Sequence, residues 1–217
     1  MARFATAIVV VIFNTFVAHA QLARTYAPET HPSLSWKKCT TSGNCETITG
    51  SVTLDANWRW VHSKSSTKNC YTGNSWDSAQ CPDGKTCAAI CALDGAAYAD
   101  DYGITSSGSA ISLKFKSTSG SGQGMLGSRV FLMANDTRYQ VFNLLNQEIS
   151  FDVDVSRVPC GFSGSFSLLG MDADGGMAKF PNNKAGAKYG TGYCNSKCSR
   201  NLKFINGEVG QFHTVSY

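Results

Sequence analysis

Apolar and polar residues alternate one by one in two stretches of this chain, and this alternation limits the folds that it can adopt. Residues 111–116 carry apolar side chains at the first, third and fifth positions, and residues 149–155 repeat the pattern. Successive side chains of a β-strand point to opposite faces, so each stretch predicts a strand with one buried and one solvated face. Weaker strand candidates cover residues 52–62, 129–133, 139–145, 166–171 and 202–205.

Glycine-, serine- and asparagine-rich segments separate these candidates, as in residues 117–124. Only residues 82–92 resemble a helix, and Pro82 suits a first helical turn. Several alternating strands joined by such turns predict an all-β fold, an antiparallel sandwich or jelly roll.

The first twenty residues have the layout of a secretory signal peptide. Arg3 precedes an apolar run over residues 4–17, and Ala18-His19-Ala20 fits a cleavage site. A membrane anchor is the alternative, but the run is short for a bilayer span. We therefore expect residues 1–20 to be removed, Gln21 to become the N-terminus, and the protein to be secreted and extracellular.

Nine cysteines in an exported chain indicate disulfides. Three pairs can form locally, namely Cys39–Cys45, Cys70–Cys91 and Cys81–Cys87. The later cysteines cannot all pair among themselves, so at least one pairs with another chain or has a partner that is missing. These are Cys160, Cys194 and Cys198.

Other site types find little support. A zinc site would need Cys-x-x-Cys pairs with histidine partners, and the aspartates of 171–176 lack the further ligands of a calcium loop, so we expect no metal and no cofactor. A net charge of +4 is too small and scattered to indicate nucleic-acid binding. The sequon Asn135-Asp136-Thr137 predicts an N-glycan.

Trp58 and Trp60 are the candidate binding residues that the pattern itself suggests. Indole faces stack on sugar rings, and both residues share the parity of Val52 and Leu54 within the expected strand. The same parity also fits two tryptophans that extend a core face, so both interpretations stay open. Glycosidase chemistry needs two carboxylates roughly 5 Å apart, and composition does not identify such a pair.

Seven strings of the sequence resemble glycoside hydrolase family 7, the family of cellobiohydrolases and endoglucanases. They follow the family's order and cover nearly everything from Gln21 to Gly207. The strings are residues 29–39, 55–60, 93–98, 151–155, 171–176, 185–194 and 202–207.

This resemblance implies a concanavalin-like jelly roll of two antiparallel sheets with a long cleft for cellulose. It implies retaining hydrolysis of β-1,4-glucosidic bonds, a monomer, and no nucleic-acid or membrane partner. Trp58 and Trp60 would stack on glucosyl rings. Other cleft-side positions fall on Tyr71, Tyr102, Arg129, Tyr193 and Lys203.

The chain also departs from the family pattern. Arg24 and Ala92 replace a cysteine pair that is frequent in the family, which supports the local pairings above. Ser167 replaces a tyrosine that lies near the nucleophile in many members of the family, and Asn201 replaces an aspartate near Lys203.

The family's catalytic string Glu-x-Asp-x-x-Glu follows the match at 202–207. Here the sequence diverges after Gly207, and Glu208 is the only acidic residue that remains. The resemblance places the partners of Cys160, Cys194 and Cys198 in the same missing region. We therefore expect a jelly-roll portion at 21–207, incomplete at its C-terminus, and a divergent tail at 208–217. Such a chain would be a truncated cellulase without turnover; the alternatives are a lectin-like cellulose-binding protein and an unstable fragment.

Overall fold

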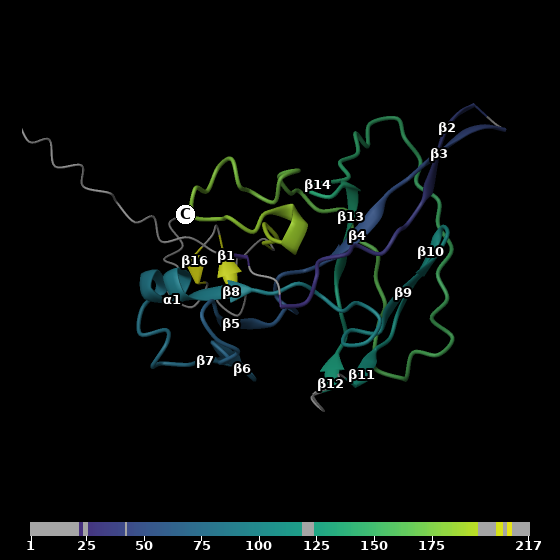
Figure 1. Cartoon of the computed structure of the whole chain (residues 1–217). Helices are drawn as coiled ribbons and strands as arrows, with labels where there is room; N and C mark the ends of the chain where they lie inside the picture. The colour runs from purple at the N-terminus through teal and green to yellow at the C-terminus, as the bar shows by residue number, and fades with distance from the viewer. Residues whose placement is uncertain are drawn as a thin grey trace, which may run out of the picture.

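The computed structural model describes residues 22–23, 26–41, 43–118, 124–194, 203–205 and 208–209. The expected signal peptide, Arg24, Cys198, Asn201 and most of the expected tail lie outside these residues. The described chain is built almost entirely of short β-strands, with a single seven-residue α-helix (Figure 1).

The sheet that carries the candidate site has the order β14-β13-β4 and is antiparallel throughout. It consists of β4 (Ser51–Leu54), β13 (Val130–Asn135) and β14 (Arg138–Tyr139). Leu54 faces Val130 across the ladder, and Val52, Leu54, Phe131 and Met133 are buried. The strand expected at residues 129–133 is therefore confirmed as part of β13, which contributes Phe131 and Met133 to the core.

A second three-stranded sheet has the order β1-β8-β5. Its strands are β1 (Leu22–Ala23), β8 (Cys91–Leu93) and β5 (Val61–Ser63), and the β1–β8 pairing is parallel. Every residue of β5 and β8 is buried. Figure 1 shows this sheet beside the helix, on the other side of the molecule from β9 and β10.

Antiparallel hairpins make up the remaining described strands. They are β2 (Trp36–Thr41) with β3 (Asn44–Ile48), β6 (Tyr71–Thr72) with β7 (Ser75–Trp76), β9 (Ile104–Ser107) with β10 (Ala110–Leu113), β11 (Lys116–Thr118) with β12 (Gly124–Leu126), and β15 (Phe204–Ile205) with β16 (Glu208–Val209).

The helix α1 (Gly84–Ile90) lies within the expected range of 82–92. Asp83 is its N-cap, and one carboxylate oxygen accepts hydrogen bonds from the backbone N–H groups of Lys85 and Thr86, each at 2.9 Å. The helix ends at Ile90 because Cys91 adopts an extended conformation and begins β8.

Disulfides fix the helix to its surroundings. The structure joins Cys70 to Cys91 and Cys81 to Cys87, and Cys39 to Cys45 across the β2–β3 hairpin, which are the expected pairs. Cys160 is a free, exposed thiol. Cys194 is disulfide-bonded, so the expectation that its partner is missing is wrong.

Several expected strands do not form as expected. Residues 52–62 divide into β4 and β5 with a turn between them, and residues 111–116 divide between β10 and β11, with Leu113 left 45% exposed. Residues 149–155 and 166–171 form no strand, and residues 139–145 contribute only the end of β14. Residues 149–155 and 166–171 carry the expected apolar residues, but a strand also needs backbone hydrogen bonds to a neighbouring strand, and within the described part of the chain these two segments make none.

Candidate glucan-binding site

The candidate site is built around the turn formed by residues 55–60, which connects β4 to β5. The backbone N–H of Trp58 donates to the carbonyl of Asp55 at 3.0 Å, and that of Arg59 donates to Ala56 at 3.2 Å. The Asp55 carboxylate also accepts the N–H of Asn57 at 2.7 Å. The expected strand face shared by Trp58 and Trp60 is therefore wrong, because the segment is a turn.

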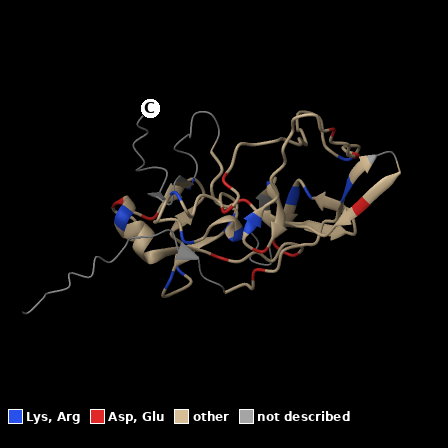
Figure 2. Cartoon of the chain, turned by 90° about the horizontal axis from the view of Figure 1, so that it is seen from above, with Lys and Arg blue, Asp and Glu red and all other residues tan. Residues whose placement is uncertain are grey.

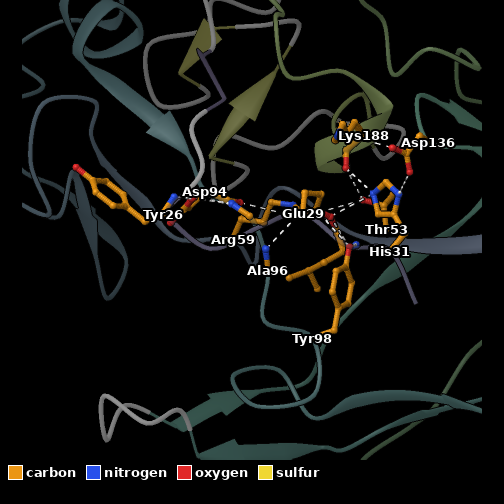
Figure 3. Close-up of polar contacts among 12 residues, drawn as sticks. Tyr26, Glu29, His31, Thr53, Arg59, Asp94, Ala96, Tyr98, Asp136 and Lys188 are labelled. Atoms are coloured by element: carbon orange, nitrogen blue, oxygen red, sulfur yellow. Dashed lines mark hydrogen bonds and ion pairs between the residues drawn. The ribbon is translucent and has the colours of Figure 1, made fainter. Parts of the chain in front are cut away.

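Arg59 fixes this turn from inside the protein. Its side chain is fully buried and makes two hydrogen bonds with the Glu29 carboxylate, at 2.6 and 2.9 Å (Figure 3). It also donates to the carbonyl oxygens of Leu54 and Asp94, both at 3.1 Å. A bidentate pair with its remaining donors satisfied is the geometry in which a buried ion pair is tolerated.

Glu29 is the centre of this network. It accepts hydrogen bonds from the Tyr98 hydroxyl at 2.7 Å and the Ala96 backbone N–H at 3.0 Å, and its carboxylate lies 3.2 Å from His31. Burial alone would raise the pKa of Glu29, but hydrogen bonds from His31 and Arg59 outweigh it and lower the pKa to about 2. Glu29 is therefore a permanent anion at neutral pH.

His31 extends the network to the loop after β13. One ring nitrogen lies 3.2 Å from the Asp136 carboxylate, and the other lies 2.9 Å from the carbonyl oxygen of Lys188. Burial opposes the charged ring, but the facing carboxylates and this carbonyl raise the pKa of His31 above its usual value. The N-terminal segment is thereby held against both the loop after β13 and the 3₁₀-helix η1 (Ala187–Tyr189).

On the outer side of the turn, aromatic rings surround Arg129. Its guanidinium carbon lies 3.5 Å from the ring centroid of Tyr193 and 5.0 Å from that of Trp58. Its Nε donates to the Asp55 carboxylate at 2.7 Å. Burial raises the pKa of Asp55, although the charge of Arg129 opposes this rise. The Arg129 side chain is 29% exposed, so this cation, which packs over aromatic rings, is partly accessible to solvent.

Lys203 contacts the same turn. Its ammonium group donates to the carbonyl of Arg59 and its backbone N–H donates to the Asn57 side chain, both at 2.8 Å. The ammonium also lies 5.0 Å from the ring centroid of Tyr71, which packs edge-on against Trp76. Burial lowers the pKa of Lys203 to about 8.

The structure therefore distributes the seven sequence-predicted residues unevenly. Trp58, Arg129 and Tyr193 form one group, and Lys203 and Tyr71 form another at the same turn. Trp60 is half-buried and has separate neighbours, since its indole N–H donates to Asn69 at 2.6 Å and its ring lies 4.2 Å from that of His62. Tyr102 lies in the core cluster against which Trp58 packs, and it is 7% exposed.

The sequence analysis missed the polar residues that build the turn, namely Glu29, Asp55, Asn57 and Arg59. The available signal was a charged pair, Asp55 and Arg59, within a short string that contains two tryptophans. Among the described residues, the carboxylates around the turn are all engaged. Glu29 and Asp55 bind arginines, and Asp94 accepts the backbone N–H groups of Tyr26 and Gly95, each at 2.8 Å.

One group of possible metal ligands occurs among the described residues. The sulfur atoms of Cys70, Cys81 and Cys91 lie together, but all three belong to disulfides. Basic and acidic residues are interspersed along the chain (Figure 2). Within the described residues, no helix has the length and hydropathy needed to cross a membrane.

Comparison with known proteins gives a consistent result. Residues 23–214 match the model of the family described as Glycosyl hydrolase family 7, and the match runs past Gly207 into the segment expected to diverge. A family 7 cellobiohydrolase from Daphnia pulex is 44% identical, with a TM-score of 0.83 over 87% of this chain. A Melanocarpus albomyces cellobiohydrolase solved with cellotetraose is also 44% identical over 87% of this chain, with a TM-score of 0.78.

An endoglucanase I solved with cellobiose is 35% identical over 85% of this chain, with a TM-score of 0.71. This chain spans only 43%, 44% and 46% of the lengths of these three structures, respectively. The fold is the antiparallel, nearly all-β architecture of the jelly-roll structures that it matches. On the family match and these identities, the chain belongs to glycosyl hydrolase family 7.

Proposed function

We propose that this chain supplies the glucan-binding part of a cellulase-type glycoside hydrolase, and that the 217-residue chain binds β-1,4-glucan without hydrolysing it. The observation that carries the proposal is the group of Trp58, Arg129 and Tyr193 at the turn 55–60. It occurs in a chain 44% identical to a cellobiohydrolase that was solved with cellotetraose.

The geometry suits a chain of glucose rings. A pyranose presents C–H groups on its faces and hydroxyls around its edge, so it is complementary to an indole ring flanked by hydrogen-bond donors. Trp58 is half-buried and rests on the core, which orders its ring before a ligand arrives. Ordering a binding side chain in advance lowers the entropy cost of binding.

Arg129 would supply the directional contacts. Its Nε is committed to Asp55, while its two terminal nitrogens have no hydrogen-bond partner among the described residues. These N–H groups are available to sugar hydroxyls. The ion pair with Asp55 and the ring of Tyr193 hold the guanidinium in place, so Arg129 would donate from a fixed position.

Hydrolysis with retention requires an acid and a nucleophile about 5–5.5 Å apart. Glu29, Asp55 and Asp94 are each held by arginine or backbone N–H groups, so none of them suits proton transfer to a leaving group. We propose that the catalytic pair of the complete hydrolase comes from sequence beyond these described residues.

The test is adsorption of the purified chain to crystalline cellulose. Removing the indole in Trp58→Ala should weaken binding about tenfold, since a stacked ring contributes about 1.4 kcal/mol. Trp36→Ala is the matched control, because Trp36 packs edge-on against Phe142 on the β2 side of the molecule. Equal binding by the two variants, or cellobiose release from cellotetraose by the 217-residue chain, would contradict the proposal.

We further propose that residues 1–20 direct secretion and that Asn135 carries an N-glycan. Asn135 is exposed at the turn between β13 and β14, and its side-chain oxygen accepts the backbone N–H of Thr137 at 3.0 Å. When the chain is expressed in a secreting eukaryotic cell, the protein recovered from the culture medium should begin at Gln21. Its mass should fall when an enzyme that removes N-glycans is added. Asn135→Gln should abolish that loss; retention inside the cell, or an unchanged mass in the wild type, would refute this part.

A further inference from the structure

The ring of His31 faces hydrogen-bond acceptors at both of its nitrogens. Nε2 lies 2.9 Å from the carbonyl oxygen of Lys188 and 3.2 Å from a carboxylate oxygen of Glu29 (Figure 3). Nδ1 lies 3.2 Å from a carboxylate oxygen of Asp136. The His31 side chain is only 2% exposed, so protein atoms rather than bulk water surround the ring.

This arrangement fits one protonation state of the ring. A neutral imidazole carries one N–H donor and one bare nitrogen that can only accept. With acceptors at both nitrogens, either neutral tautomer would turn a lone pair toward an oxygen atom. The imidazolium ion donates from both nitrogens and therefore matches all three oxygens. The geometry indicates that His31 is charged in the folded protein.

The charged groups around the ring come from three other parts of the fold as well as from its own segment. Glu29 lies two residues before His31 and is paired with Arg59 of the turn at 55–60. Asp136 belongs to the turn between β13 and β14, and the ammonium of Lys188, in η1, lies 3.6 Å from its carboxylate. Two carboxylates thus face the ring directly, and each of the two cations pairs with one of them.

The balance of these groups favours the charged ring. Burial alone would lower the pKa of His31, but the hydrogen bond to Glu29, the contact with the Lys188 carbonyl and the charge of Asp136 outweigh it and raise the pKa above its usual value.

The two nitrogens hold their protons with different strength. Nε2 faces two oxygens that other groups fix in place, since Arg59 binds Glu29 and the Thr53 hydroxyl donates to the same Lys188 carbonyl at 3.0 Å. Nδ1 faces only Asp136, whose side chain is 72% exposed and can be solvated by water. The Nδ1 proton should therefore leave first, and its loss sets a lone pair against the Asp136 carboxylate.

We propose that His31 is a pH-operated clamp between residues 26–33 and the turn that joins β13 to β14. The clamp is closed while both ring nitrogens carry protons. It opens when Nδ1 loses its proton, while Nε2 keeps its hydrogen bond to Lys188. The inference concerns the fold and does not depend on glucan binding or hydrolysis.

The direction of the pH effect follows from linkage. Folding favours the charged ring, so the clamp stabilises the protein fully below the unfolded-state value of about 6.5. This contribution is lost as the pH rises through the midpoint of the folded state. The clamp thus responds to alkaline pH, opposite to the effect of acid on Glu29.

The test is a pH titration of the ¹⁵N-labelled 217-residue chain, followed by NMR at the ring nitrogens of His31. The His31→Gln variant identifies these signals by their absence. We expect a midpoint above about 6.5 and, at high pH, a neutral ring that keeps its proton on Nε2.

A matched pair of variants locates the partner of Nδ1. Asp136→Asn should lower the His31 midpoint by about half a pH unit, because an exposed ion pair contributes at most about that much. Asp172→Asn is the control and should leave the midpoint unchanged, because Asp172 is also exposed and pairs with Lys179 at 2.8 Å. Both changes are at exposed side chains, so both variants should fold.

Urea unfolding tests the effect on stability. As the pH rises from about 6 to about 9, the urea midpoint of the wild type should fall relative to that of His31→Gln. That variant keeps the other groups that titrate in this range, such as Lys203 with its pKa of about 8. If His31→Gln does not fold, Asp136→Asn takes its place and should show a smaller fall than the wild type.

Three results would overturn the proposal. The first is a wild-type midpoint at or below about 6.5. The second is a neutral ring whose proton lies on Nδ1. The third is the same His31 midpoint in Asp136→Asn and Asp172→Asn.

Discussion

At the scale of single residues, the buried ion pair between Glu29 and Arg59 decides whether the turn at 55–60 keeps its shape. Both side chains are shielded from water. The Glu29 carboxylate also accepts a hydrogen bond from the Tyr98 hydroxyl and contacts the ring of His31. Removing one member of such a pair leaves the other charge buried without compensation. The two residues are 30 positions apart, so no local sequence pattern reveals their contact.

Glu29 makes the stability of the fold depend on acid pH. Its pKa is lowered from 4.5 to about 2, so its contribution is fully present above pH 4.5 and is lost as the pH falls through 2. The difference corresponds to about 3 kcal/mol of unfolding free energy. In urea titrations, the wild type should lose about this amount between pH 5 and pH 2 relative to Glu29→Gln.

At neutral pH, Glu29→Gln itself should cost about 3 kcal/mol or more, because it leaves Arg59 buried and without a counterion. If the unfolding free energies of the wild type and Glu29→Gln changed equally with pH, the Glu29 carboxylate would not be what holds the turn.

At the scale of elements, the close approach of the end of η1 to the end of β4 helps to fix the turn at 55–60. Gly190 ends η1 with a φ of +72°, and its carbonyl accepts the backbone N–H of Ala56 at 3.0 Å. A Cβ at Gly190 would collide with the carbonyl oxygen of Leu54. Only glycine allows both this conformation and this approach.

We therefore expect Gly190→Ala to lower the unfolding free energy by at least about 3 kcal/mol, from combined backbone strain and collision with β4. Gly108 is the matched control, because its φ is +60° but a Cβ there would meet no atom within 4 Å. Gly108→Ala should cost only about 1 kcal/mol. Equal costs in thermal or urea unfolding would refute the role of the close approach.

The same scale explains which parts of the fold could be predicted. The expectation of a strand around Val52 and Leu54 is correct because β13 pairs with its backbone and Leu54 packs in a core cluster that includes Tyr98. The stronger alternation of 149–155 fails because strand formation depends on a partner that the sequence of the segment does not contain. The aromatic residues of the site could be named from the family resemblance, while the polar contacts that hold them could not.

At the scale of the whole molecule, the paired strands and the segments without ladder hydrogen bonds should differ in local stability. The strands β4 and β13 are hydrogen-bonded to each other and contain buried residues such as Leu54 and Met133, whereas 149–155 and 166–169 have neither ladder hydrogen bonds nor buried side chains. Amide exchange reports local opening, so the second group should exchange within seconds and the first far more slowly. Similar protection of both groups in the isolated chain would contradict this description.

Binding of a glucan chain at the turn 55–60 is tested most directly by the indole N–H signals in a ¹⁵N NMR spectrum. Adding cellotetraose should shift the Trp58 indole signal in a saturable manner and leave that of Trp36 unchanged, while no cellobiose appears in the sample. Shifts at Trp36 alone, no shift at Trp58 at saturating sugar, or conversion of the cellotetraose would contradict the claim.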